Sequence, residues 1–318
     1  MDRLDAMRLY TRIVERASFT QAAHDMALPR STVTKVIREL ETRLGVRLLQ
    51  RTTRVVRPTL DGEAYYRRCL AILDDIEDAE GAFSGAQPKG VLRVEVQGTL
   101  ARHFLLPGLP AFLERHPQIE IQMSESDRWV DLVEEGVDCA LRYGKLRDSE
   151  LVARKVATLQ RLTCATPGYL ERFGTPAGIE ELGSHQVVGL RSITTGNVTP
   201  LEFAQGEQVK TLSLPSVLSV TGAESYLAGI RLGLGLAQVP YFHVENDLKT
   251  GALVSILPDS PPPPAPVWML WHRTRQLSPR VRVFLEWAAQ EFAARSAQAQ
   301  PLGEWGEWGE WGEGAPVY

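Results

Sequence analysis

Polar and basic side chains gather on one face of a helix predicted between residues 30 and 44. They are Arg30, Ser31, Thr34, Lys35 and Arg38. The other face is apolar, with a spacing of four, three and four between Val33, Ile37, Leu40 and Leu44. A helix of this width fits the major groove of DNA, where Arg and Lys meet guanine acceptors and Ser and Thr meet bases or phosphates. A charged, solvated face is the alternative interpretation, and it is common on any protein.

The neighbouring residues predict elements that would position this face. An amphipathic helix is expected near residues 4–17 and a short helix over residues 20–26, followed by a turn at 27–29 and a stop at Gly45. The β-branched, basic residues 50–59 favour a small hairpin. Its arginines would meet phosphates or a minor groove; they are Arg51, Arg54 and Arg57.

Charge is distributed unevenly along the 318 residues. The formal net charge is −4, but residues 1–60 hold 12 Lys/Arg and 6 Asp/Glu, a net of +6. The body, residues 61–302, has a net charge of −6, and residues 303–318 carry four Glu and no Lys or Arg. A basic head on an acidic body indicates a nucleic-acid-binding head.

The segment after residue 60 predicts a long helix. An a/d seam runs along it through Tyr65, Cys69, Ile72, Ile76, Ala79 and Phe83. Either the helix packs on its own domain or it joins two copies of the chain. We favour the dimerising linker, because the segments on both sides already predict complete units.

Strand and helix patterns alternate from residue 90 onwards. Strands are expected at 91–96, 119–123 and 139–142, with helices at 105–115 and 129–135 between them. This βαβαβ order predicts an α/β domain with a mainly parallel sheet. The pattern restarts near residue 162, so two similar α/β halves are expected, joined near residues 161 and 265.

Several other protein classes are excluded by what the sequence lacks. It shows no membrane-length apolar run, no N-terminal signal peptide, no zinc spacing of Cys or His, and no Gly-x-Ser-x-Gly motif. The three scattered cysteines fit a reducing cytoplasm. No catalytic constellation, cofactor or metal site is therefore expected. Residues 303–314 repeat Gly-Glu-Trp, which predicts a disordered, solvated tail; docking of its tryptophans is the alternative.

The N-terminal motif resembles the winged helix-turn-helix of LysR-type transcriptional regulators. The resemblance lies in residues 18–23, 29–41 and 44–51, and in Thr59-Leu60-Asp61-Gly62, which is similar to the family's entry into its linker helix. It continues more weakly through residues 136–144 and 229–240, and covers about residues 1–295 in all. Arg30 departs from the family pattern, which often has Gln there. The Gly-Glu-Trp tail has no family counterpart.

This resemblance implies an all-α-rich winged helix-turn-helix domain followed by an α/β effector domain of two subdomains, similar to a periplasmic binding protein. The expected divisions are a DNA-binding domain at 1–59, a linker helix at 60–88, an effector domain at 89–296 and a tail at 297–318. Subdomain I would comprise 89–161 and 266–296, and subdomain II 162–265. The residues expected to contact DNA are Thr20, Arg30, Ser31, Thr32, Thr34, Lys35, Arg38, Arg51 and Arg54.

The effector site is expected where helix starts follow strand ends, at residues 98–100, 126–128 and 221–223. Free helix N–H groups favour an anion there, and Arg142 beside Tyr143 adds a charge. Ordinary capping and a surface ion pair are the alternatives for these residues. The expected set is Thr99, Leu100, Asp127, Arg142, Tyr143, Thr221 and Gly222.

The sequence thus predicts a cytoplasmic transcriptional regulator rather than an enzyme. Its expected partners are double-stranded promoter DNA, a small, anionic effector and further copies of the chain in a dimer or tetramer, with RNA polymerase as a further candidate and no membrane. The alternatives are a cytoplasmic small-molecule receptor and an architectural DNA binder without effector control. Sequence-selective DNA binding distinguishes the regulator from both.

Overall fold

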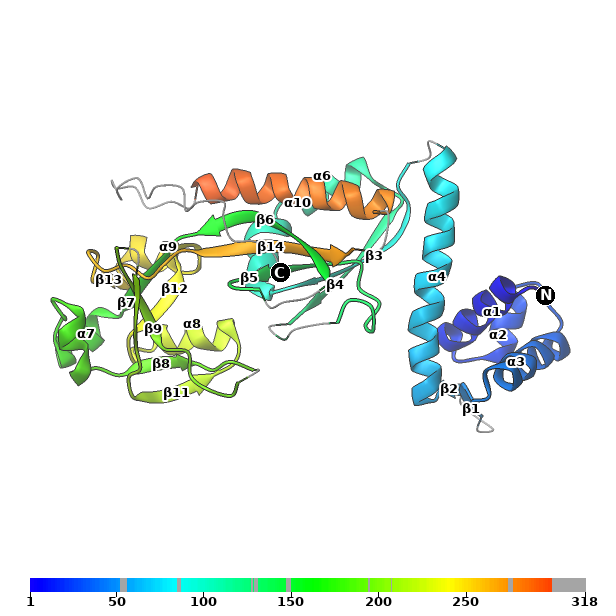
Figure 1. The fold of residues 1–318 in the computed structure, drawn as a ribbon, viewed down its shortest axis with the longest axis horizontal. Helices are drawn as coiled ribbons and strands as arrows, with labels where there is room; N and C mark the ends of the chain where they lie inside the picture. Colours follow the sequence, from blue (N-terminus) through cyan, green and yellow to red (C-terminus); the bar gives the residue numbers. More distant parts are fainter. Residues whose placement is uncertain are drawn as a thin grey trace.

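A computed structural model describes residues 1–51, 56–84, 87–126, 128, 131–146, 150–193, 195–206, 208–273 and 277–298. These residues form a helical head, one long helix and two α/β halves (Figure 1). The prediction of a helix-turn-helix head on a two-part α/β body is confirmed. Among the described residues, no helix is long and apolar enough to span a membrane.

The head consists of three helices and a hairpin: α1 (Arg3–Arg16), α2 (Phe19–Asp25), α3 (Arg30–Leu44), β1 (Leu49–Arg51) and β2 (Val56–Pro58). Side chains cap the first two helices, because Asp2 accepts a 2.7 Å hydrogen bond from the Asp5 amide and Ser18 accepts one from Gln21. Pro29 is the N-cap of α3, and Gly45 ends this helix at a φ of 72°.

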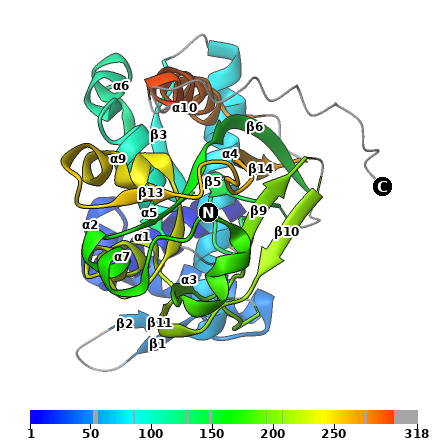
Figure 2. The ribbon, with the colours of Figure 1, turned by 90° about the vertical axis from the view of Figure 1, so that its left-hand side faces the viewer.

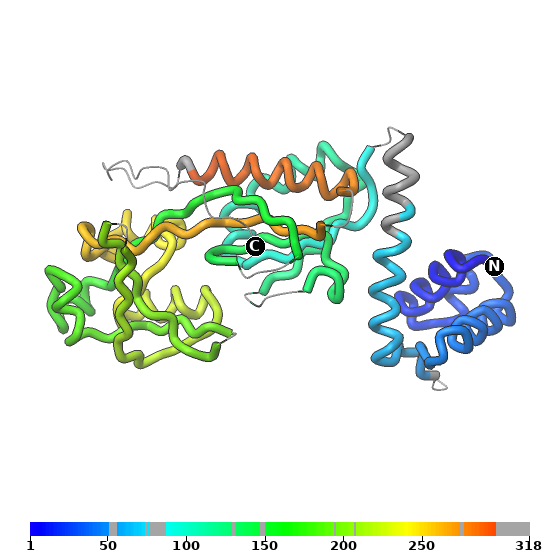
Figure 3. The backbone as a smooth tube through the Cα atoms, viewed as in Figure 1, coloured from blue at the N-terminus to red at the C-terminus, as the bar shows by residue number. Residues whose placement is uncertain are grey.

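The long helix α4 (Leu60–Ser84) lies between the head and the rest of the molecule (Figure 3). Cys69 is buried in the core of the head, and Tyr65 packs against that core. The first part of the predicted a/d seam therefore packs on its own head. Ile72, one heptad beyond Tyr65, has 38% of its surface exposed. The seam is thus partly buried in the head and partly exposed to solvent. Its spacing alone does not distinguish these two parts.

The first half contains a five-stranded sheet in the order β4-β3-β5-β14-β6. Its elements are β3 (Gly90–Val96), α5 (Gly98–Leu100), η1 (Ala101–Leu105), α6 (Leu109–Arg115), β4 (Ile119–Glu125), β5 (Cys139–Tyr143), β6 (Leu151–Leu159), β14 (Ala265–His272) and α10 (Pro279–Gln298). Strands β3, β4 and β5 are parallel, whereas β14 is antiparallel to both β5 and β6. The sheet is therefore mixed.

The second half contains smaller sheets, in the orders β12-β7-β13, β11-β8 and β10-β9. Its elements are β7 (Arg161–Ala165), α7 (Pro167–Phe173), η2 (Ile179–Ser184), β8 (Val187–Leu190), β9 (Leu201–Gln205), β10 (Gln208–Leu212), β11 (Ser216–Val220), α8 (Ala223–Arg231), β12 (Ala237–Pro240), α9 (Tyr241–Thr250) and β13 (Val254–Ile256). A bridge between Val187 and Leu236 links β8 to the start of β12.

Two chain crossings join the halves. The first runs from β6 directly into β7 through Gln160, and the second enters β14 at Ala265. Strands β6 and β14 pair along their lengths, from Ala265 opposite Leu159 to His272 opposite Leu151. The two crossings are therefore hydrogen-bonded neighbours, an arrangement that suits a hinge.

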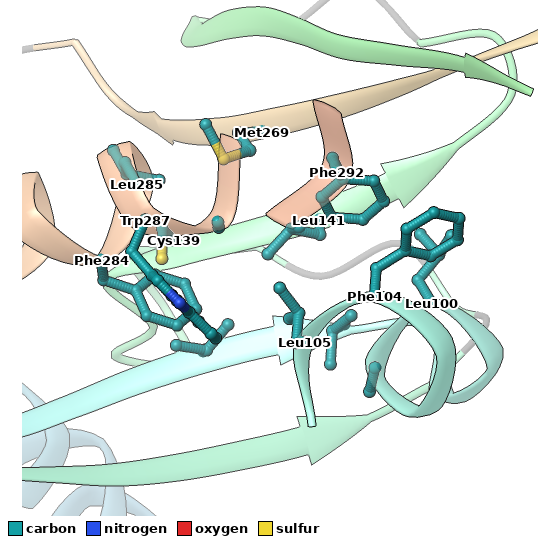
Figure 4. Packing of buried hydrophobic residues seen from close by; sticks show 14 of the residues in the cluster. Leu100, Phe104, Leu105, Cys139, Leu141, Met269, Phe284, Leu285, Trp287 and Phe292 are labelled. Atoms are coloured by element: carbon teal, nitrogen blue, oxygen red, sulfur yellow. The ribbon is translucent and has the colours of Figure 1, made fainter. Parts of the chain in front are cut away.

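The core of the first half lies between the sheet and the helices α6, α10 and η1. Figure 2 shows α6 and α10 beside each other above the strands, and Phe112 of α6 packs on Phe284 and Trp287 of α10. In Figure 4, Phe104 of η1 lies against Phe292 of α10, with stacked rings 4.5 Å apart. Burial of these aromatic side chains fixes η1 on the sheet.

Two predicted helices of the first half differ from the structure. Residues 132–136 form turns, so the predicted helix over 129–135 is wrong across its described part. The backbone changes direction at Gly136, which has a φ of 66°. Residues 129 and 130 lie outside the described residues. The helix predicted over 105–115 is divided into a π-helix, η1, and α6, with Pro107 in the turns between them.

Candidate nucleic-acid interface and effector cleft

The exposed face of α3 carries the polar residues predicted to contact DNA. Its buried face is formed by Val33, Val36, Ile37 and Leu40, which fix the rotation of the helix in the head. Opposite them, Arg30, Ser31, Lys35 and Arg38 are exposed, and Thr32 and Thr34 are half-buried. An open depression of about 750 Å³ runs along this face and is also lined by Glu39, Thr42 and Arg43. Thr20 is exposed at the start of α2.

The cations of the head differ in whether carboxylates already neutralise them. On α1, Arg16 lies 2.7 Å from Asp25, and Arg12 lies 3.1 Å from Glu15. Within the described residues, Arg30 and Arg38 of α3 form no ion pair, and Lys35 forms only a loose one with Glu39, at 3.9 Å between exposed side chains. Uncompensated positive charge therefore faces solvent on α3.

The hairpin beyond α3 is held to the head through a carboxylate. Glu41 of α3 accepts hydrogen bonds of 3.0 and 3.1 Å from the amides of Leu48 and Leu49. These two bonds hold the start of β1 against α3. The hairpin is therefore fixed to the head beside this helix. Arg57 is exposed on β2, and Arg51 ends β1. The predicted DNA contact Arg54 lies outside the described residues.

Six of the seven predicted effector residues lie in the described part of the chain, after β3, at the end of β5 and at the start of α8. The parallel strands β3, β4 and β5 end together, with Val96 paired to both Glu125 and Leu141. Thr99 and Leu100 follow β3, and Arg142 and Tyr143 complete β5. Thr221 and Gly222 lead into α8 of the second half, which reaches the same edge through a contact described below. Asp127 lies outside the described residues.

Two members of this set, both in the turn after β3, are buried. Leu100 is 1% exposed and packs in the core with Phe104, so its side chain faces away from solvent. Thr99 is 8% exposed, and its carbonyl oxygen lies 3.0 Å from Nδ1 of His103. Ligand contacts from this turn would therefore come chiefly from Thr99 and from backbone atoms.

Arg142 is part of a buried ion pair rather than a surface one. Its Nη2 atom lies 3.5 Å from Oε1 of Glu95, and both residues are at most 6% exposed. Its Nη1 atom donates a 2.8 Å hydrogen bond to the carbonyl oxygen of Ser126. Arg142 thereby ties the end of β5 to the end of β4. The partner Glu95 was not found from the sequence, because a lone Glu in an apolar strand gives no spacing signal.

Tyr143 occupies the junction of the two halves. Its amide donates a 2.9 Å hydrogen bond to Oε1 of Gln97. Its hydroxyl is buried, with no hydrogen-bond partner in the described part of the chain. Burial raises the pKa of Tyr143 to about 12, and Arg161 and Glu202 of the second half also act on it. An inward-facing hydroxyl without a partner is a candidate donor to a ligand.

The structure adds a contact between the halves that the sequence did not predict. Arg102 of η1 hydrogen-bonds Glu224 of α8, and its other terminal nitrogen lies 3.1 Å from Oε2 of Glu125. Beside it, the His103 ring packs edge-on against Phe242 of α9, with centroids 4.9 Å apart. Within the described residues, no group of three or more His, Cys, Asp or Glu is placed to hold a metal ion.

Comparisons with known proteins agree with this architecture. Residues 4–63 match the family model of the bacterial regulatory helix-turn-helix protein, lysR family, and residues 85–293 match that of the LysR substrate binding domain. The chain belongs to the LysR family of bacterial transcriptional regulators. It is therefore classed with regulators rather than with enzymes.

Individual relatives match over nearly the whole chain. The uncharacterized HTH-type transcriptional regulator YhjC of Escherichia coli is 37% identical, over 91% of this chain and 97% of that protein. An HTH-type transcriptional repressor of Pseudomonas aeruginosa is 34% identical, over 92% and 93%. The structure of CrgA, a LysR-type transcriptional regulator from Neisseria meningitidis, has a TM-score of 0.58 at 30% identity and covers 91% of this chain and 98% of that one.

Proposed function

We propose that this regulator binds promoter DNA sequence-specifically through α3 and that a small anionic effector controls it. The observation that carries the proposal is the set of uncompensated cations on α3. Arg30 and Arg38 face solvent without a carboxylate partner in the described residues, whereas Arg12 and Arg16 on the neighbouring helix are paired. Phosphate oxygens would supply the missing negative charge, and the polar side chains between the cations would meet base edges.

The DNA-contacting set proposed here is the one expected from the sequence. Its members are Thr20, Arg30, Ser31, Thr32, Thr34, Lys35, Arg38, Arg51 and Arg54. Binding as a dimer would place two copies of α3 in successive major grooves on one side of a pseudo-palindromic site. We assign the dimer contact to the exposed part of the seam on α4, where Ile72 is 38% exposed.

The proposed division of the chain follows the elements. Residues 1–59 bind DNA, residues 60–88 link and dimerise, and residues 89–296 bind the effector. Subdomain I comprises 89–161 and 266–296, and subdomain II comprises 162–265. Residues 297–318 form a tail outside these units. The single crossing residue between β6 and β7 supports the boundary near residue 161.

The effector site is proposed where the ends of β3, β4 and β5 face the start of α8. Its residues are Thr99, Leu100, Asp127, Arg142, Tyr143, Thr221 and Gly222. The unpartnered hydroxyl of Tyr143 supports a ligand at this position. Arg142 is paired with Glu95 and hydrogen-bonded to the carbonyl oxygen of Ser126. It would therefore position the strand ends around the ligand and attract an anion less strongly than an unpaired guanidinium. Ligand binding would shift the two halves and, through α4, the DNA-binding heads.

Two rival functions make different predictions for DNA binding. A gel-shift assay with the upstream region of the gene and with random DNA, at two salt concentrations, separates them. The regulator prefers one upstream sequence, and its affinity for that sequence falls with salt. Equal affinity for both DNAs would indicate an architectural binder, and no affinity for either would indicate a small-molecule receptor. Loss of the preference in a Lys35→Ala/Arg54→Ala variant locates it in the head.

A further inference from the structure

The π-helix η1 of the first half contacts both α8 and α9 of the second. Arg102 bonds Glu224 of α8, and the His103 ring lies 6.1 Å from the His243 ring of α9. Phe104, on the same short helix, packs edge-on against Phe242 at 5.0 Å. Single π-helical turns within helices are often found at functional sites. One charged contact and several ring contacts therefore join the halves here.

The charged contact holds one guanidinium between two carboxylates. Glu125 ends β4 in the same half as Arg102, whereas Glu224 lies in the first turn of α8 in the other half. Gly98 makes room for this group, because a Cβ atom there would lie 2.4 Å from Oε2 of Glu125 and 3.1 Å from Nη2 of Arg102. The Arg102 and Glu125 side chains thus rest on the bare backbone at the start of α5.

Solvent and small ions reach this cluster. The side chains of Arg102, Glu125 and Glu224 are 44%, 40% and 61% exposed. An exposed ion pair contributes little to stability, so another anion can replace one of its members. Glu224 is the member that can leave, since it is the most exposed and belongs to the other half. Glu125 stays with Arg102 because both belong to the first half.

We infer that Arg102 binds the anionic group of the effector and that Glu224 occupies its place when no effector is bound. The inference rests on the effector cleft of the proposed function and deepens it. The ligand class is a small molecule bearing a carboxylate or phosphate group, which matches the hydrogen-bonding fork of a guanidinium. On binding, the anion takes Nη1 of Arg102, and the Glu224 carboxylate moves into solvent.

This exchange gives the site a way to signal that it is occupied. In the unliganded state α8 is tied to η1 through Glu224, and the ligand breaks that tie. The uncharged contacts of Phe242 with His103 and Phe104 do not depend on the exchanged anion. They therefore remain as a pivot while α8 moves. The position of the second half would then follow the state of Arg102.

The test uses full-length protein, with inorganic phosphate and succinate as probes in isothermal titration calorimetry. Glu224→Gln removes the competing charge at nearly constant size, so it should bind one or both probes about threefold to fivefold more tightly than the wild type. Arg102→Gln should lose the binding. The matched control is Glu180→Gln, which breaks an exposed ion pair with Lys210 in the second half and should leave probe affinity unchanged.

Each result decides the inference. Tighter binding by Glu224→Gln together with loss in Arg102→Gln supports it. It is overturned if Arg102→Gln binds a probe as the wild type does, if Glu224→Gln is no tighter than the wild type, or if Glu224→Gln binds neither probe. Circular dichroism and DNA affinity confirm that each variant is folded. Intact sequence-selective DNA binding in these variants would leave the proposed function standing even where Arg102 fails.

Discussion

The hydroxyl of Tyr10 in α1 donates a buried hydrogen bond of 2.9 Å to the carbonyl oxygen of Gly62 in α4. Gly62 has no room for a side chain, because a Cβ atom there would lie 2.0 Å from the carbonyl oxygen of Leu48. Thr59 completes the junction, since its hydroxyl donates to the Arg47 carbonyl at 2.7 Å and accepts from the Gly62 amide at 2.9 Å. The head is thereby fixed to the helix that would carry an effector signal to it.

We expect substitutions at this junction to destabilise the head. Tyr10→Phe should cost about 1 kcal/mol, the usual value of one buried hydrogen bond. Gly62→Ala should cost about 2 kcal/mol or more, because the backbone of Leu48 must move. Hydrogen exchange in α1 and α3 measures both losses. The matched control is Gly168→Ala in α7, where a Cβ meets no atom within 4 Å. Equal protection in Gly62→Ala and the wild type would show that the junction is looser than described.

Neutralising an unpaired cation on α3 should weaken DNA binding. Arg38→Gln is expected to lower the magnitude of the slope of log K against log salt by about 1, as for one lost phosphate contact. Arg12→Gln removes the same charge from α1, where Glu15 and Asp25 already neutralise it. Its slope should stay close to that of the wild type. Fluorescence anisotropy at several salt concentrations measures both, and equal slopes for the two variants would place the phosphate contacts elsewhere.

Breaking the buried pair of Arg142 and Glu95 should destabilise the first half. Arg142→Met leaves the Glu95 carboxylate buried without its cation, at a cost of about 3–5 kcal/mol. The double variant Arg142→Met/Glu95→Met removes both charges and should recover much of that loss. Urea unfolding of the three proteins measures the recovery. A double variant less stable than Arg142→Met would contradict the assignment of the pair as a coupled unit.

Acid should destabilise the folded chain through His243. Burial, together with the nearby His103 and Arg231, lowers the pKa of His243 to about 3. Because this pKa is depressed in the folded state, the unfolded chain binds the extra proton below about pH 6.5. Stability is therefore full above pH 6.5 and falls toward pH 3, by at most about 1.4 kcal/mol per pH unit for one proton.

His243→Gln should reduce this acid dependence, since Gln has no proton to gain. The control is His24→Gln in α2, which changes a histidine whose side chain is 92% exposed. Thermal unfolding between pH 7.5 and pH 5 compares them. The assignment would be wrong if His243→Gln lost stability with acid as steeply as the wild type.

Local patterns in the sequence predict the head well. The spacing of Val33, Ile37 and Leu40 fixes which face of α3 is buried, and the capping residue Ser18 and the stop at Gly45 fix two helix ends. Each of these features depends on residues that are close in the sequence, so it can be recognised without knowing the rest of the fold. The α/β class of the body also follows from the alternation of strands and helices.

Contacts between distant segments could not be predicted in this way. Arg102 and Glu224 are 122 positions apart, and nothing near either residue marks the other. Strand β6 was missed because its middle residues are exposed and polar, as suits an outer strand of the sheet. Part of the predicted seam on α4 packs on the head and part faces solvent. Which residues are buried depends on how the head packs, and the spacing of Tyr65 and Cys69 does not reveal it.

Site-directed cleavage shows whether α3 enters the groove of its DNA site. Ser31 is exposed on α3, whereas Cys69, Cys139 and Cys164 are all buried, so Ser31→Cys provides one reactive surface thiol. A DNA-cleaving chelate attached there should cut the preferred upstream sequence at two positions about one helical turn apart, or a multiple of it. The same chelate on Ser184→Cys, in the second half, should not. Absent or scattered cuts from Ser31→Cys would show that α3 does not lie in the groove.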